Sequence, residues 1–319
     1  MLQSPPETWA QEASRTVALG RSDLWTITPF LLFTLLLSAV FWALSIMTRG
    51  SAYYTAGLMW APALSAMLAL RLRGENLASL GLSTFGGRNS LIGYCLPFLY
   101  CVIAYGEIWM FGLGSFPNLA EVAGLRSQLG WRLNSPIAIV LLYVLLVTTT
   151  GMVPAIARAL GEEIGWRGFL APQLAKHLGF RWSALITGLI WTAWHLPIIL
   201  FGGYHSVAPR SFALSCFTVM VVGLSFILTW LRMRSGSVWP CAIMHASHNI
   251  LIQAVFTRLT TERGAITAYA VDEFGFAVPA VVFVVAVLIW RWWPGRAAKF
   301  GASNVSLLES LEKLVEFRL

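Results

Sequence analysis

Charged residues in an apolar part of the chain could form a hydrolytic site. In the segment Gly161-Glu162-Glu163-Ile164-Gly165-Trp166-Arg167, Glu163 and Arg167 stand four residues apart. On a helix they share one face and can form an ion pair. Glu162 points about 100 degrees away and lacks that partner. The segment therefore offers one paired and one unpaired carboxylate.

Histidine and asparagine side chains occur in two later apolar stretches. His195 follows Trp191 by four residues, and His245 precedes Asn249 by four, with His248 offset from that pair. A lone histidine in an apolar helix is more often a structural hydrogen-bonding residue than a catalyst. Ionisable residues at membrane depth cost roughly 2.5–3.5 kcal/mol each, so a set of them favours a wet, reactive cavity.

These residue types suit hydrolysis, which needs a base to activate water and donors to hold the oxyanion. Glu162 with His195 can supply the base, and His245 with Asn249 can supply the donors. Glutamate and histidine are also standard zinc ligands, so Glu162, His195 and His245 could hold a divalent metal instead. Both interpretations stay open from the residues alone.

Other protease designs are absent from the sequence. It has no HExxH motif and no GxSxG elbow. Asp23 and Asp272 lie at the edges of apolar stretches, so no aspartate pair is expected inside the membrane. The remaining candidate is a hydrolytic mechanism that uses glutamate and histidine.

The composition requires lipid around the chain. Of 319 residues, 57% are hydrophobic and 11% are charged, and the mean hydropathy is +0.71. A water-soluble domain of this size cannot bury so many apolar side chains. The net charge of +8 is scattered between apolar blocks, which favours an anionic membrane surface over nucleic acid as its partner. We expect an all-α polytopic membrane protein in contact with the lipid bilayer and no nucleic-acid partner.

Eight stretches are long and apolar enough to cross a membrane as helices. They are residues 27-47, 53-70, 90-113, 136-158, 183-201, 212-231, 237-256 and 275-293. The predicted organisation is an N-terminal segment 1-26, a membrane domain 27-299 that encloses a catalytic cavity, and an amphipathic tail 300-319. The tail would lie on the membrane surface or pack on a partner.

The loops between these stretches differ in charge. One set of alternate loops contains more than twice as many Lys and Arg residues as the other. Under the positive-inside rule, this difference places both termini in the cytoplasm. Glu107, in the third stretch, could face the cavity, although a position near the membrane interface is the simpler interpretation.

Three motifs in order resemble the CPBP family of intramembrane proteases, also called the ABI or type II CAAX prenyl endopeptidase family. They are Glu162-Glu163-x-x-x-Arg167, an aromatic-x-x-x-His from Trp191 to His195, and His245-x-x-x-Asn249. The resemblance covers about residues 150-255. Trp191 stands where the family pattern usually has phenylalanine, and His248 lies outside the pattern, so both are expected around the site.

The resemblance implies eight transmembrane helices around a membrane-embedded cavity and peptide hydrolysis by a glutamate-activated water. By position, Glu162 would be the catalytic base and His195 its partner, while His245 and Asn249 would hold the oxyanion. Glu163 with Arg167 would organise the site. We expect no obligatory cofactor, although the family has also been described as metal-dependent, and zinc could be bound.

Three hypotheses follow for function. The first is an endopeptidase that cuts a membrane-anchored peptide or protein near the cytoplasmic face, with CAAX-type C-terminal processing as one case. The second is a proton-coupled transporter, although the chain lacks the matched halves with broken helices of inverted-repeat carriers. The third is a non-catalytic immunity or assembly partner, and retention of every motif residue weighs against it.

Overall fold

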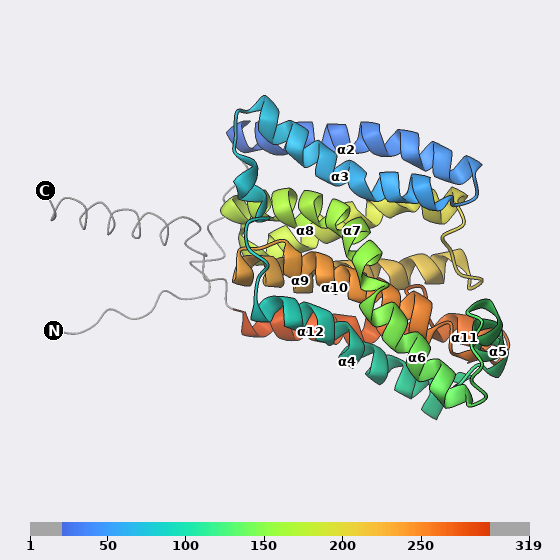
Figure 1. Cartoon of the computed structure of the whole chain (residues 1–319). Helices are drawn as coiled ribbons and strands as arrows, with labels where there is room; N and C mark the ends of the chain where they lie inside the picture. Colours follow the sequence, from blue (N-terminus) through green and yellow to red (C-terminus); the bar gives the residue numbers. More distant parts are fainter. Residues whose placement is uncertain (1–20, 294–319) are drawn as a thin grey trace, which may run out of the picture.

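The computed structural model describes residues 21–293, and these residues are almost entirely helical (Figure 1). The helices are α2 (Arg21–Met47), α3 (Ala52–Leu72), α4 (Arg88–Met110), α5 (Leu119–Gln128), α6 (Pro136–Thr149), α7 (Met152–Glu163), α8 (Ala171–Phe201), α9 (Arg210–Ser235), α10 (Trp239–Asn249), α11 (Ala265–Ala270) and α12 (Ala277–Trp292). The predicted all-α polytopic membrane fold is confirmed. The predicted tail 300-319 and most of the segment 1-26 lie outside the described residues.

Short elements of other kinds complete the described chain. A 3-10 helix, η1 (Leu77–Leu80), precedes α4, and two π-helical segments, η2 (Ile164–Leu170) and η3 (Ile250–Phe256), continue α7 and α10. The two-residue strands β1 (Gly114–Ser115) and β2 (Thr261–Glu262) pair antiparallel. They tie the loop after α4 to the loop after η3.

Five helical stretches in the described chain are long and apolar enough to cross a membrane. They are Thr26–Met47, Ala52–Leu72, Arg88–Met110, Met152–Phe201 and Arg210–Ser235. Pro136–Thr149 and Ala277–Trp292 are apolar but shorter. The chain is an integral membrane protein, but the predicted count of eight spans is not confirmed.

The predicted fourth span is divided in the structure, because α6 ends at Thr149 and α7 begins at Met152. Three consecutive threonine hydroxyls, those of Thr148, Thr149 and Thr150, each donate to the carbonyl four residues earlier. Such bonds bend helices. Gly151 and Pro154 follow, and proline offers no N–H to continue the hydrogen-bond ladder.

The helix that begins at Met152 is much longer than the sequence suggested. It runs as α7, η2 and α8 to Phe201, with a sharp turn at Gly179, whose φ of 71° suits glycine. The predicted motif segment and the predicted fifth span are therefore two arms of one helical stretch. This arrangement brings Glu162 on the first arm close to His195 on the second.

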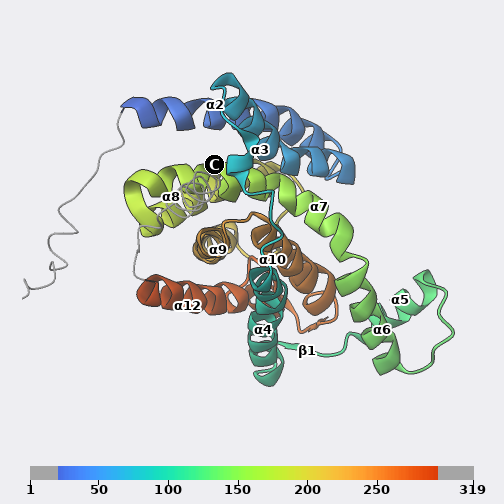
Figure 2. The ribbon, with the colours of Figure 1, turned by 60° about the vertical axis from the view of Figure 1, so that its left-hand side comes forward.

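The helices pack in successive layers in both views of the molecule (Figures 1 and 2). The α2–α3 pair covers α7 and η2, α7 packs on α10, and α10 packs on α4. On the other side α8 packs on α9, and α9 packs on α12. The motif-bearing elements α7, α8 and α10 are thus interior, covered by α2 and α3 on one side and by α4 and α12 on the other.

Two glycines allow the glutamate-bearing helix to approach α3 closely. A Cβ atom at Gly165 would lie 2.3 Å from the Cβ atom of Pro62. One at Gly161 would lie 2.6 Å from the carbonyl oxygen of Met59. Small residues spaced four apart bring helix backbones together in this way in membranes. The glycine pair therefore fixes where the two glutamates between its members lie.

We expect Gly165→Ala to destabilise the protein by about 1–3 kcal/mol, because the added methyl group must displace Pro62. Thermal unfolding in detergent measures the effect. Gly106→Ala on α4 is the matched control, since a Cβ there meets nothing within 4 Å. Equal thermal stability of the two variants would contradict the proposed close contact.

Candidate active site

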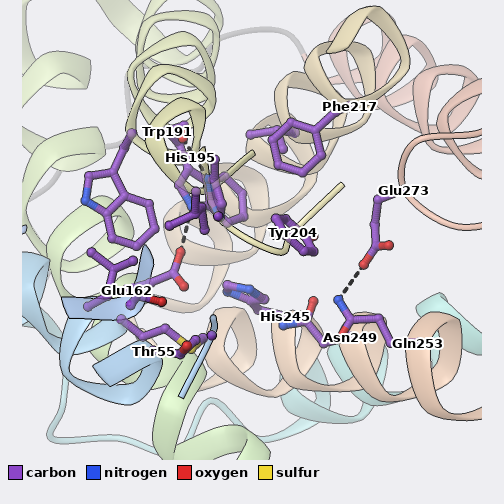
Figure 3. A pocket seen from close by; sticks show the side chains of 18 of the residues that line it. Thr55, Glu162, Trp191, His195, Tyr204, Phe217, His245, Asn249, Gln253 and Glu273 are labelled. Atoms are coloured by element: carbon purple, nitrogen blue, oxygen red, sulfur yellow. Dashed lines mark hydrogen bonds between the residues drawn. The ribbon is translucent and has the colours of Figure 1, made fainter. Parts of the chain in front are cut away.

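A cavity of about 380 Å³ lies among the motif-bearing helices (Figure 3). Glu162, His195, His245 and Asn249 all line it. The α2–α3 loop, with Arg49 and Gly50, and the α8–α9 loop also line it, and we take these two loops as its mouth. The structure thus brings the four residues expected to perform the chemistry to one space. Their chemical roles stay predictions.

The Glu163 carboxylate binds two partners and is completely buried. Its Oε1 atom accepts a hydrogen bond from Arg167 at 3.0 Å and one from Nδ1 of His245 at 2.9 Å. The predicted ion pair between Glu163 and Arg167 is confirmed. The contact with His245 links the first and third motifs across α7 and α10.

The buried Arg167 side chain also contacts the second motif. Its guanidinium carbon lies 4.3 Å from the centre of the Trp191 ring, in a cation–π arrangement. The backbone carbonyl of Arg167 accepts a hydrogen bond from the buried Arg232 at 3.0 Å. Arg167 is therefore held by α8 and α9 as well as by Glu163.

Glu162 is buried at 2% exposure and forms no ion pair with the described residues. Its Oε2 atom accepts a hydrogen bond from Nε1 of Trp191 at 2.7 Å. The sequence interpretation treated Trp191 as a wall residue whose difference from phenylalanine leaves the chemistry intact. The structure shows instead a direct bond to Glu162 that phenylalanine could not make.

His195 is half-buried among aromatic rings, including those of Trp194 and Phe217. Its Nδ1 atom lies 2.9 Å from the carbonyl oxygen of Trp191, so Nδ1 carries the proton. The Nε2 atom is then left as an acceptor. The described contacts include no direct hydrogen bond between His195 and Glu162, although both line the cavity.

The two residues of the third motif, His245 and Asn249, differ in their hydrogen bonding. His245 uses Nδ1 to bind Glu163, while the Asn249 amide forms no hydrogen bond with the described side chains or backbone. His248 does lie next to the site, as expected, and its Nδ1 atom is 2.6 Å from the hydroxyl of Tyr100. Its Nε2 atom is buried without a hydrogen-bond partner in the described chain.

Each pair of motif residues on α7 and α10 is followed directly by a π-helical segment. Segment η2 starts after Glu163, and η3 starts after Asn249. π-helical turns often occur at functional sites because they change the direction of side chains relative to a regular α-helix. The sequence pattern gave no sign of them.

Other residues of the cavity were not anticipated. Tyr204, Gln253 and Glu273 line it, opposite Glu162 in Figure 3. Glu273 could have been found from sequence, because it is an ionisable residue directly before an apolar stretch. Glu107 is exposed on α4 and does not line the cavity, in agreement with the interface interpretation.

The predicted metal ligands do not form a metal centre in this arrangement. Among residues 21–293, no three His, Cys, Asp or Glu side chains are gathered so that they could hold an ion. His245 directs one ring nitrogen to Glu163, and His195 directs one to a carbonyl. That zinc is possible but not required stays a prediction, and no step below depends on a metal.

The fold and site together define an intramembrane helical bundle with a buried glutamate–histidine cavity. Residues 137–251 match the family model described as type II CAAX prenyl endopeptidase Rce1-like. A CAAX prenyl protease 2 from Methanococcus maripaludis is 26% identical over 129 residues, which are 40% of this chain and 44% of that protein. The match thus spans less than half of the relative. Both matches lie over the region with all three motifs, and they support the resemblance to the CPBP family that the motifs predicted.

We expect Glu163→Ala to destabilise the fold by about 3–5 kcal/mol, because Arg167 would be left buried without its carboxylate. The yield of monodisperse protein and its thermal midpoint measure the effect. Glu162→Gln is the matched control, since it breaks no ion pair. If both variants were equally stable, the buried contact would not support the fold.

Proposed function

We propose that this protein is an intramembrane endopeptidase that hydrolyses a peptide bond of a membrane-anchored peptide or protein. The observation that carries the proposal is that, of two adjacent carboxylates, one is paired with cationic side chains and the other is not. Glu163 pairs with Arg167 and His245, whereas Glu162 lines the cavity and forms no ion pair with the described residues. A carboxylate without a cation partner is free to accept a proton from water.

In the proposed reaction, a water molecule lies between Glu162 and Nε2 of His195. Glu162 takes one proton while the water oxygen attacks the carbonyl carbon of the substrate. The amide of Asn249 and the ring of His245 stabilise the negative oxygen that forms. The C–N bond then breaks, and the amine departs with the proton held by Glu162. One water molecule is consumed, and a new carboxyl end and a new amine result.

The names of the similar proteins support peptide hydrolysis over transport or a non-catalytic role. Both the matching family and the archaeal relative are described as CAAX proteases. The contact between Glu162 and Trp191 also favours hydrolysis, since it holds the carboxylate in one orientation toward the cavity.

We expect Glu162→Gln to lower cleavage at least about 100-fold, because an amide cannot accept the proton from water. The measurement compares peptides released in membranes containing wild-type or variant protein, by mass spectrometry. Glu107→Gln provides the control for a carboxylate-to-amide change outside the cavity. A parallel sample with a chelator tests metal dependence. Equal cleavage by Glu162→Gln and wild type would refute the mechanism.

We further infer that the cavity opens on the side of the membrane away from the cytoplasm. The mouth loops lie at the end of the bundle opposite the start of α2 and the end of α12 (Figure 1). The end without the mouth is rich in basic residues outside the membrane core, namely Arg71, Arg73, Arg88, Lys176, Arg181, Arg234 and Arg291. The positive-inside rule favours this end for the cytoplasm.

This orientation keeps the prediction of cytoplasmic termini but opposes the prediction of cleavage near the cytoplasmic face. The two were compatible on the sequence alone. They conflict if the cavity opens at the end of the bundle opposite the described chain ends. CAAX-type processing of a cytoplasmic tail through this mouth would require the reverse orientation.

Cysteine labelling in intact cells tests the orientation. We expect Val207→Cys, in the mouth loop between α8 and α9, to react with a membrane-impermeant maleimide added outside. Ala78→Cys, at the basic end, should react only after the membrane is opened. Both native side chains are exposed. The reverse pattern would place the cavity mouth in the cytoplasm and restore a cytoplasmic substrate.

A further inference from the structure

A second buried carboxylate faces the cavity, on the wall opposite Glu162 (Figure 3). Glu273 lies in the loop between α11 and α12 and is only 3% exposed. Its Oε1 atom accepts a hydrogen bond from Nε2 of Gln253 at 2.6 Å. Tyr204, from the loop between α8 and α9, lines the same wall. Three polar side chains from separate elements thus meet at this wall.

The described chain offers no cation to Glu273. No Lys or Arg side chain among residues 21–293 forms an ion pair with it, and its hydrogen-bond donor, Gln253, is neutral. Glu163, by contrast, has Arg167 and His245. A buried carboxylate is usually paired with a cation or hydrogen-bonded from several sides. A cation is the complement that Glu273 lacks.

A second carboxyl group, that of Asp272, lies next to Glu273 in the loop but does not line the cavity. Burial, together with the Glu273 carboxylate, raises the pKa of Asp272 to about 7. A positive group that enters the cavity would stabilise the ionised form of Glu273. The wall is therefore suited to a cationic group and unsuited to an anionic one.

One polar side chain of the cavity has no partner within the described chain. Asn249 lines the cavity, and its amide forms no hydrogen bond with residues 21–293. His248 also lines the cavity, but its Nε2 atom is buried and does not reach the cavity surface. The Asn249 amide is therefore the group available to bind an occupant.

The remaining wall is apolar, with side chains from α9 such as Phe217, Met220 and Leu224. The cavity therefore combines an apolar surface, the reacting carboxylate at one side and a second carboxylate at the other. A peptide whose scissile bond lies at Glu162 would place a neighbouring side chain toward Glu273. In a mostly apolar pocket, a small number of polar groups usually determines the orientation of the ligand.

Resting on the proposed function, we propose that Glu273, with Gln253 and Tyr204, forms a subsite that binds a lysine or arginine side chain of the substrate near the scissile bond. The substrate class is then a membrane-anchored peptide with a basic residue next to the cleavage position. An ammonium or guanidinium group can replace or join the Gln253 amide as the donor to Glu273.

Cleavage of defined peptides tests the subsite. Each peptide carries a palmitoylated cysteine as the membrane anchor and one scanned position with Lys, Arg, norleucine or Glu. We expect the wild-type protein to cleave Lys or Arg peptides at least about tenfold better, in kcat/KM, than the norleucine peptide at one position. Glu273→Gln should bring that ratio close to one, while Glu107→Gln should preserve it. Acetylated and free N termini separate a side-chain preference from recognition of the terminal amine.

Binding to the Glu162→Gln protein provides a second test that needs no hydrolysis. The Lys peptide should bind at least about tenfold more tightly than the norleucine peptide, and adding Glu273→Gln should remove the difference. Glutamine keeps an acceptor for Gln253, so an unchanged thermal midpoint controls for folding.

The possible failures can be told apart. Cleavage with no charge preference at any scanned position, or a preference that survives Glu273→Gln, would overturn the subsite and leave the peptidase intact. A charge preference in binding without Glu162-dependent cleavage would keep the subsite and refute the proposed hydrolysis.

Discussion

The Glu163 carboxylate is the contact on which the rest of the site depends. Arg167 and Glu163 are both buried in a helix that crosses the membrane, where an unpaired charge is costly. The attraction between the two charges offsets the cost of removing each from water. His245 binds to the same carboxylate oxygen. The contact joins two helices whose motifs are more than 80 residues apart in the chain. It also leaves the adjacent Glu162 as the carboxylate without a cation.

The packing of neighbouring helices explains how the ion pair of Glu163 with Arg167 is held in place. Gly161 and Gly165 allow the helix to lie against α3, and Trp191 contacts both Arg167 and Glu162. On the opposite side, Arg232 donates to the carbonyls of Arg167 and Ser79. These contacts reach the site from α3, α8 and α9. The charged centre is thus surrounded by rigid helices, which limits the reorganisation needed when water reacts.

The sequence predicted the parts of this site that depend on helical spacing. Residues four apart lie on one face, so the ion pair of Glu163 with Arg167 and the position of Glu162 outside it followed directly. The apolar composition predicted the all-helical membrane fold for the same reason, since every backbone group must be satisfied within a segment. Both results rest on interactions within a few residues.

The division of the predicted fourth span was missed although its cause is local, because the threonine run before Gly151 lies within an apolar stretch. Features that depend on long-range contacts were not predictable. The bond between His245 and Glu163 requires knowledge of how α10 packs on α7, and spacing within α10 suggested only a pair with Asn249. Likewise, Trp191 was recognised as part of a motif, but its bond to Glu162 depends on the turn at Gly179 that places α8 beside α7.

The most direct test of the division between the two carboxylates is the cleavage rate per folded molecule of Glu162→Gln and Glu163→Gln, measured side by side in lipid nanodiscs. Glutamine at position 163 keeps an oxygen that can accept from Arg167 and His245. If Glu162 is the base, folded Glu163→Gln protein retains measurable cleavage and Glu162→Gln protein has none. Loss of cleavage in Glu163→Gln with activity retained in Glu162→Gln would reverse the assignment and contradict the account.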